Sequence, residues 1–555
     1  MLDLLLIINS IFLILVLLLT YFSIGIVFKI TTRILIGKEI YFSVFKTVLY
    51  GLLILVFFYV LIKSTYLLNS VSVTCLPILI FFYERSMSIN GVIPKANNEN
   101  WIKFSLLGFL GFLIFYLAKY LFHFSSQINT GYSDQAFYHT IASSLKFTGV
   151  ETVNIHTGEL QLIPGMIYHY WDLWFLAFHY DFLSILNQLG LFESFNQFEI
   201  NILVFQPSLF LILFIGFIEV SLMTITRNFS ILKFRISIIV IISLLVLSHS
   251  FLEFGIIHHP KQFLIASIFV YFILEILQNK IRTIDFFYFY PILLFSYPLP
   301  GAVLIATCFL FSINWENIAA NFSERKFYYD VISVLTTCCL FILYYFFYAQ
   351  TCIPQLYSQN KPPWSLLTAV SRIFIYHGYH TMISPLGVFI CLNLLILLFI
   401  FKGRIFSNNI SRDCFKYLLM FSILNILVGH FLSAIMYNVP EEFQFYNNDY
   451  FSLALILLLD TIFLFYHLRK KLILPFSICF TSFFYFINTS FYNKPNFYKG
   501  ISMSYNNYFT LKSKKFNKDI PVQIDDNLDV LYSFSDIIPS FHNSYSRHKK
   551  NICLN

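Results

Sequence analysis

Residues 4–28 read LLLIINSIFLILVLLLTYFSIGIVF, an apolar run long enough to cross a lipid bilayer as a helix. Similar runs recur along the chain as far as Ile487. Of the 555 residues, 58% are hydrophobic and only 12% are charged, about half of the charged fraction of a typical soluble domain. This composition excludes a soluble enzyme and a disordered chain. It predicts an all-α polytopic membrane protein.

The apolar runs predict about 14 membrane-spanning helices, with a range of 12 to 14. The first run is too long for a cleavable signal peptide, and the basic residues follow it instead of preceding it. The shortest expected spans are the pair at 284–298 and 300–314. The expected spans cover residues 3–28, 45–62, 66–83, 103–124, 198–223, 236–251, 261–278, 284–298, 300–314, 329–349, 383–401, 416–436, 451–467 and 472–490.

Lys and Arg are distributed unevenly between the loops. If the N-terminus is outside, the loops after odd-numbered spans and their edges hold 21 of the 36 Lys and Arg residues. Positively charged loops stay in the cytoplasm, so we expect both termini to be extracytoplasmic in a multi-pass membrane protein of the bacterial inner membrane. Leaving the C-terminal tail aside, the other basic residues are Lys63, Lys119, Lys146, Lys261, Lys361 and Arg372.

The expected topology divides the chain into three regions. Residues 1–102 form an N-terminal extension of three spans, and residues 103–490 form a transmembrane core with a long outer loop at 125–197. Residues 491–555 form a polar extracytoplasmic tail. Because about 65 residues are hardly enough for an independent core, we expect this tail to pack on the outer loops.

The first outer loop contains GYSDQAFYHTIASSLKFTG, which predicts a short amphipathic helix at the membrane surface. Ser133 is a typical N-cap, Ile141 and Leu145 continue an apolar face that starts at Phe137, and Gly149 ends the segment. Asp134 falls in the first turn of this helix. Its carboxylate either interacts with the helix dipole or acts as a catalytic base beside a lipid-borne substrate, and its position alone leaves both interpretations open.

The same loop continues with IPGMIYHYWDLWFLAFHYDF, which predicts a second helix from about residue 166 to 189. His169 and Asp172 are three residues apart and share one face. They are candidates for binding a metal or a sugar hydroxyl, although a plain hydrogen bond explains them equally well. The aromatic residues that we expect to anchor this helix at the membrane interface are Tyr168, Tyr170, Trp171 and Trp174.

Two further groups on the outer face carry positive charge. The turn EFGIIHHPKQ holds His258, His259 and Lys261, which suit a phosphate leaving group, although an ordinary loop with a snorkelling lysine explains them as well. The loop at 350–382 holds Arg372, followed by two histidines in IYHGYH.

Three acids lie within spans, all toward the expected inner ends: Glu219, Glu275 and Asp460. None of them forms an evident proton-relay series with basic partners in neighbouring spans, and we interpret them as residues of the inner interface. This argues against a proton-coupled transporter.

The long outer loop, its surface helix opening with S-D-x-x-F-Y, and the many short-looped spans resemble the GT-C superfamily over roughly residues 103–280. This superfamily consists of multi-pass glycosyltransferases that use polyprenyl-phosphate-linked sugars. Three spans precede the expected first one, and the loop has no DD, DE or ExD pair. The resemblance implies Asp134 as the catalytic base. From their charge, we expect His258, His259 and Lys261 to stabilise the leaving phosphate, alone or with a divalent metal ion.

The implied activity is sugar transfer from a polyprenyl-phosphate donor to a glycan, lipid or protein acceptor on the extracytoplasmic face. One alternative is an O-antigen-type polysaccharide polymerase or ligase, which would rely on Arg372 and the histidines after it. A transporter or flippase and a purely structural membrane protein also agree with the composition. No phosphate-binding loop and no groove-reading basic motif is present, so we expect the bilayer and not nucleic acid as a partner.

Overall fold

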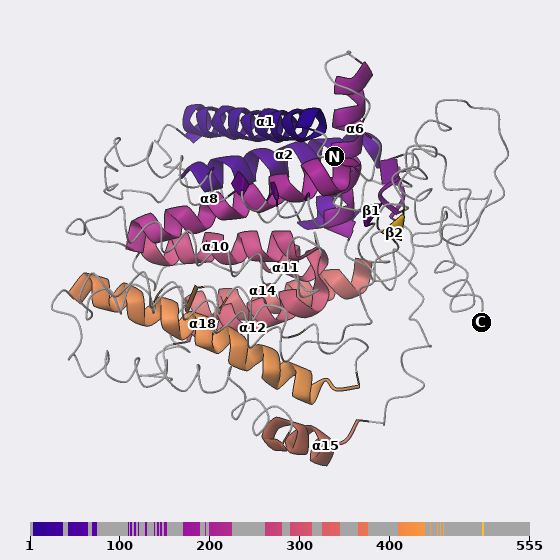
Figure 1. Ribbon diagram of the computed structural model, residues 1–555. Helices are drawn as coiled ribbons and strands as arrows, with labels where there is room; N and C mark the ends of the chain where they lie inside the picture. The colour runs from indigo at the N-terminus through magenta and orange to yellow at the C-terminus, as the bar shows by residue number, and fades with distance from the viewer. Residues whose placement is uncertain are drawn as a thin grey trace, which may run out of the picture.

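The computed structural model describes residues 4–36, 43–64, 69–74, 170–188, 199–224, 261–279, 289–313, 325–344, 364–375, 409–438 and 502–503, with single positions or short stretches between 109 and 151, at 195 and 445, and between 452 and 459. Figure 1 shows a bundle of helices and one pair of very short strands. The elements are α1 (Leu4–Ile36), α2 (Val44–Lys63), β1 (Ile128–Asn129), α6 (Tyr170–Gln188), η1 (Ile200–Phe205), α8 (Gln206–Thr224), α10 (Lys261–Asn279), α11 (Tyr290–Ser296), α12 (Pro298–Ser312), α14 (Arg325–Ile342), α15 (Leu366–Ser371), α18 (Asn409–Ile435) and β2 (Ser502–Met503).

The long helices lie side by side, and α6 runs across them at one end of the bundle (Figure 1). We call this the α6 end. α2 ends there, because Lys63 contacts Asp181 of α6. α10 begins there, because Phe263 packs against Phe175 of α6. α8 and α10 both run away from the α6 end, because Glu219 near the end of α8 and Glu275 near the end of α10 contact the first turn of α2. α2 therefore runs in the opposite direction to both.

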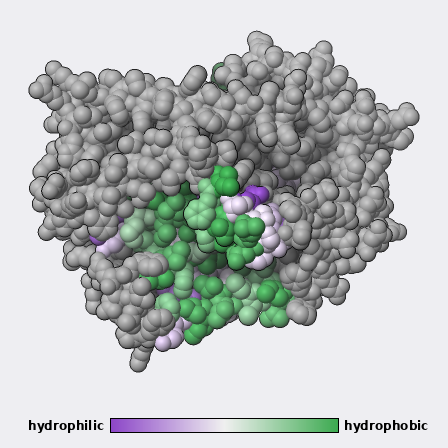
Figure 2. Space-filling view, turned by 90° about the horizontal axis from the view of Figure 1, so that it is seen from below, coloured by the Kyte–Doolittle hydropathy of each residue, from purple (hydrophilic) through white to green (hydrophobic). Residues whose placement is uncertain are grey.

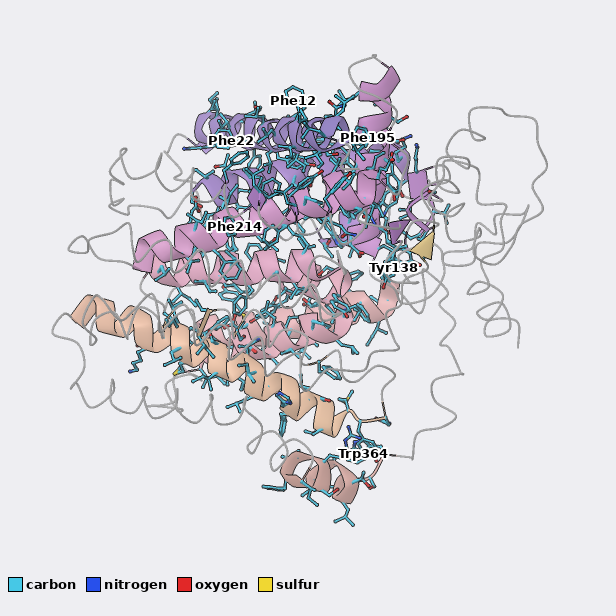
Figure 3. The ribbon with its side chains drawn as sticks, viewed as in Figure 1. Phe12, Phe22, Tyr138, Phe195, Phe214 and Trp364 are labelled. Atoms are coloured by element: carbon cyan, nitrogen blue, oxygen red, sulfur yellow. The ribbon has the colours of Figure 1, made fainter. Side chains whose placement is uncertain are left out.

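Four of the described helical segments are long and apolar enough to cross a membrane: Leu4–Thr31, Val44–Lys63, Ile200–Val220 and Lys416–Ile435. α1 buries few of its side chains and exposes an apolar stripe that includes Ile8, Phe12 and Leu19. Phe12 projects from α1 away from the bundle (Figure 3). Apolar side chains also dominate the described surface seen from below, on the side of α15 and α18 (Figure 2). These surfaces suit lipid. Apart from β1 and β2 the described elements are helices, as expected, and the four apolar segments are consistent with a membrane protein. The expected number of about 14 spans stays a prediction.

The expected spans agree with the described helices to within a few residues at most ends. The spans expected at 45–62 and 261–278 correspond to α2 and α10, and the span at 198–223 corresponds to η1 followed by α8. α1 continues past the expected end to Ile36. The spans expected at 236–251, 383–401 and 472–490 lie outside the described residues.

α11 and α12 form the short helical pair that the sequence indicates. The chain turns at Tyr297, whose backbone is extended (φ −157°, ψ 95°). A Cβ atom on Gly301 would collide with the carbonyl oxygen of Leu293, so glycine allows α12 to fold back against α11.

The C-terminal tail contacts the first outer loop through the two strands. Ile128 of β1 pairs with Met503 of β2, and Asn129 pairs with Ser502, in antiparallel register. Residues 502–503 of the expected tail thus pair with residues 128–129 of the loop that we expect on the outer face; the packing of the rest of the tail stays a prediction.

The surface helix of the first outer loop is present at the positions described. Residues 138, 141–143 and 145–146 are helical, and Ile141 and Leu145 are fully buried. Gly149 ends the segment with a positive φ of 66° and donates its N–H to the carbonyl of Leu145 at 2.9 Å. Glycine adopts this left-handed conformation without steric cost, which explains the helix end. Asp134 lies outside the described residues.

Candidate functional site at the α6 end

α6 brings polar side chains to the end of the bundle. It packs against α2, η1, α10 and α11, and most of its side chains are buried. The aromatic residues Tyr170, Trp171 and Trp174 are almost fully covered by protein, so our prediction that they anchor α6 in the lipid headgroups is wrong. They fill the space between α6 and the helix ends because α6 lies on the bundle and is covered by other segments.

Glu151 is a buried acid at this end, and several donors surround its carboxylate. Its carboxylate accepts hydrogen bonds from the backbone N–H of Ser70 (3.0 and 3.1 Å), the hydroxyl of Ser70 (2.6 Å) and the indole N–H of Trp174 (2.7 Å). The hydroxyl of Tyr344 donates a further bond. Burial raises the pKa of the Glu151 carboxyl, while these donors act in the opposite direction. Glu151 joins four segments that are far apart in the sequence.

Asp181, further along α6, binds two lysines. Its carboxylate oxygens lie 2.9 Å from Nζ of Lys63 and 3.3 Å from Nζ of Lys146. The hydroxyl of Tyr59 donates a hydrogen bond to Asp181 at 2.9 Å. The Lys63 side chain remains 39% exposed. Two ammonium groups therefore share one carboxylate, and this group of four side chains carries a net positive charge.

His179 lies between these acids and α1. Its Nε2 is 2.6 Å from the hydroxyl of Tyr21, and its Nδ1 is 2.6 Å from the carbonyl of Phe175. A neutral ring that donates from Nδ1 and accepts at Nε2 satisfies both contacts. Complete burial lowers the pKa of His179 to about 4, so the ring is uncharged at neutral pH.

The structure covers some of the residues that the sequence indicates. Asp172 is in the first turn of α6 and is only 4% exposed; its role in binding a sugar or a metal stays a prediction. Lys261 is the first residue of α10, which packs against α6. Both residues therefore belong to helix ends that meet at the α6 end. Four others, Asp134, His169, His258 and His259, lie outside the described residues.

Arg372 is in a different place. Its guanidinium carbon lies 5.6 Å from the centre of the Tyr437 ring, just beyond the end of α18. Ser365, which caps α15, donates its N–H to the same tyrosine hydroxyl at 2.8 Å, and Trp364 donates its indole N–H to the carbonyl of Ile435 at 2.9 Å. Trp364 is seen beside α15 in Figure 3. Arg372 thus belongs to the packing of α15 on α18.

Sequence reasoning missed the central residues of this site. Glu151 was one acid among several in a long loop, and Asp181 had no motif around it. A signal existed for the lysines, because Lys63 and Lys146 are two of the few basic residues on the expected outer face. Among the described residues, no group of three or more His, Cys, Asp or Glu side chains is arranged to hold a metal ion.

Comparison with protein-family models, with curated proteins and with solved structures finds no match to this chain.

Proposed function

We propose that this chain is a membrane glycosyltransferase of GT-C-like architecture. It transfers a sugar from a polyprenyl phosphate to a glycan, lipid or protein acceptor on the extracytoplasmic face of a bacterial inner membrane. In this proposal the chain crosses the membrane about 14 times, the α6 end is extracytoplasmic, and both termini lie on that side.

The observation that carries the proposal is the pair of lysines around Asp181. The side chain of Lys63 is 39% exposed, so its ammonium group is accessible to an anion such as a lipid phosphate. Lys63 is the last residue of α2, a helix that is apolar enough to cross the membrane. Its ammonium group therefore sits at the depth of lipid headgroups, where a polyprenyl donor held in the bilayer presents its phosphate.

The proposed reaction uses one carboxylate as the base and several cations to stabilise the leaving phosphate. Asp134 takes the proton from the acceptor hydroxyl while the oxygen of that hydroxyl attacks the anomeric carbon of the sugar. The bond from that carbon to the phosphate oxygen breaks, and the polyprenyl phosphate leaves with the electron pair. Negative charge develops on the phosphate, where the proposed stabilising cations act: Lys63, Lys146, His258, His259 and Lys261.

Replacing Asp134 with Asn tests the proposed base. Asn keeps the size and still caps a helix, but it cannot accept the proton, and general-base catalysis contributes roughly 10²–10⁴-fold to a rate. We expect Asp134→Asn to insert normally and to lose sugar transfer, measured as glycan product by mass spectrometry of cell envelopes. Glu193→Gln, in the same loop, is the control and should remain active. Wild-type product from Asp134→Asn would remove the catalytic assignment.

Replacing Lys63 with Gln tests the phosphate site. A hydrogen bond to a charged group contributes about 1.5–3 kcal/mol, so we expect the apparent donor affinity of membranes with Lys63→Gln to fall by about 10- to 150-fold. Lys29→Gln removes a positive charge from α1 at the opposite end and should leave donor affinity unchanged. Equal donor affinity in the wild type and Lys63→Gln would exclude Lys63 from the phosphate site without affecting the Asp134 test.

A transporter or flippase for a lipid-linked sugar is the second candidate. The observation in its favour is a charged pair buried in the bundle, Lys46 of α2 with Glu275 of α10. Proteoliposomes with a labelled lipid-linked sugar separate the two candidates. A flippase moves the label between leaflets and forms no new glycosidic bond, whereas a transferase forms the bond and leaves the remaining donor in its own leaflet.

A further inference from the structure

Three charged side chains meet inside the bundle at the end opposite α6. Lys46 comes from the first turn of α2, Glu275 from the last part of α10, and Glu219 from the last part of α8. Each is at most 3% exposed. Lys46 is thus a basic partner of an acid within a span, which the sequence did not indicate. Lys46 lies inside helix α2, which begins at Val44, so it reaches into the bundle instead of lying in a loop.

Lys46 and Glu275 form a pair with balanced charge. The ammonium group of Lys46 contacts Oε1 of Glu275 and lies 4.8 Å from the centre of the Tyr271 ring. An aromatic ring face attracts a cation. These contacts account for the positive charge of Lys46.

Glu219 has a different environment. Its Oε1 accepts the backbone N–H of Phe45 at 3.1 Å, while the hydroxyl of Ser43 accepts the N–H of Lys46 at 3.3 Å. Together they cap the first turn of α2. The second carboxyl oxygen of Glu219, Oε2, is buried without a hydrogen-bond partner among the described residues. A carboxylate in this position would bury a second negative charge beside Lys46, which is the lysine described here and already pairs with Glu275.

We propose that Glu219 is a proton-binding site: its carboxyl group carries a proton in the folded protein at neutral pH. This inference does not rest on the proposed glycosyltransferase activity. The titratable groups described at this end of the elements packed against α8 are Lys29 on α1, Lys46 and Tyr50 on α2, Tyr271 and Glu275 on α10, and Lys416 and Tyr417 on α18.

Loss of the proton has a defined structural consequence. An ionised Glu219 competes with Glu275 for Lys46, and this competition weakens the contact between α2 and α10. The folded protein should therefore become less stable when the pH rises far enough for Glu219 to lose its proton.

Infrared spectroscopy of the purified full-length protein in detergent tests the proposal. A protonated carboxyl group gives a C=O stretch that a carboxylate lacks. At neutral pH we expect this band to be weaker in Glu219→Gln than in the wild type by the amount of one carboxyl group. In Glu275→Gln, Lys46 loses its partner and draws the proton from Glu219, so the band should fall there also. Equal band intensity in the wild type and Glu219→Gln would overturn the proposal.

Folding of the same variant gives a second, independent measurement. Gln has the shape of a protonated Glu and keeps the acceptor for the N–H of Phe45. If Glu219 is protonated, Glu219→Gln elutes as a monodisperse protein with the wild-type melting temperature at pH 5, and at pH 8 it melts above the wild type. A variant that aggregates or melts well below the wild type at both pH values would mean that α2 needs an ionised cap, which also overturns the proposal.

Discussion

At the scale of single residues, His179 predicts how acid affects the protein. The ring is buried between α6 and α1, and its pKa is about 4, below the ordinary value of about 6.5. Between these two values the unfolded chain binds a proton that the folded protein does not. The contribution of neutral His179 to the free energy of unfolding is therefore fully present above pH 6.5 and decreases as the pH falls toward 4. This pKa shift corresponds to about 3 kcal/mol of the free energy of unfolding.

We therefore expect the melting temperature of the wild type in detergent to fall between pH 6.5 and pH 4. His179→Gln has no proton to gain, so its melting temperature, although lower at neutral pH, should change less over the same interval. Parallel melting curves for the two proteins across this pH range would contradict the assignment of a neutral, buried ring.

Glu151 and Lys46 explain why the site was predicted only in part. Periodicity and charge counting place Lys63 and Lys146 on one face of the membrane, because these rules depend on residues near in sequence. They do not reveal that Glu151 binds Ser70, Trp174 and Tyr344, because those contacts depend on how distant segments pack. The same limit hid the pair of Lys46 with Glu275, 229 residues apart.

At the scale of elements, the positions of helices were predictable because span length is set by bilayer thickness. α2 and α10 begin and end within a few residues of the expected bounds. Which face of a helix meets protein was less predictable. α6 has aromatic residues typical of a membrane interface, yet protein covers them.

The contact between α1 and α2 gives a prediction at this scale. A Cβ atom on Gly25 would collide with the carbonyl oxygen of Thr47, and one on Gly51 would collide with that of Tyr21. Small residues of this kind allow membrane helices to approach closely. We expect Gly51→Leu to force the helices apart and to destabilise the protein by about 1–3 kcal/mol or more.

The measurement is the melting temperature in detergent, together with the rate of proteolysis of the purified protein. Leu19→Phe is the matched control, because it adds bulk to α1 at a side chain that is 64% exposed. If both variants melt like the wild type, α1 and α2 do not pack through these glycines.

At the scale of the whole molecule, the arrangement of the helices agrees with the charge pattern. α2 and α14 end at the α6 end, where Lys63 contacts Asp181 and Tyr344 contacts Glu151. α18 runs antiparallel to α12, because Phe311, near the end of α12, packs against Phe421 in the first half of α18. Since α12 begins at the α6 end beside α11, the start of α18 lies at the opposite end of the bundle. β1 and β2 join the first outer loop to the tail, so the tail at that point shares the side of the loop.

These directions turn the charge bias into a prediction about two positions. Ser411 stands at the start of α18, and Asn507 follows β2 by a few residues. The positive-inside rule places the start of α18, with Arg412 and Lys416 near it, in the cytoplasm, and the tail outside. In a background without native cysteines, Asn507→Cys in intact cells should react with a membrane-impermeant maleimide. Ser411→Cys should react only after the membrane is opened. If only Ser411→Cys is labelled in intact cells, the topology is the inverse of the one expected. The lysines around Asp181 would then lie in the cytoplasm, which contradicts an extracytoplasmic site at the α6 end.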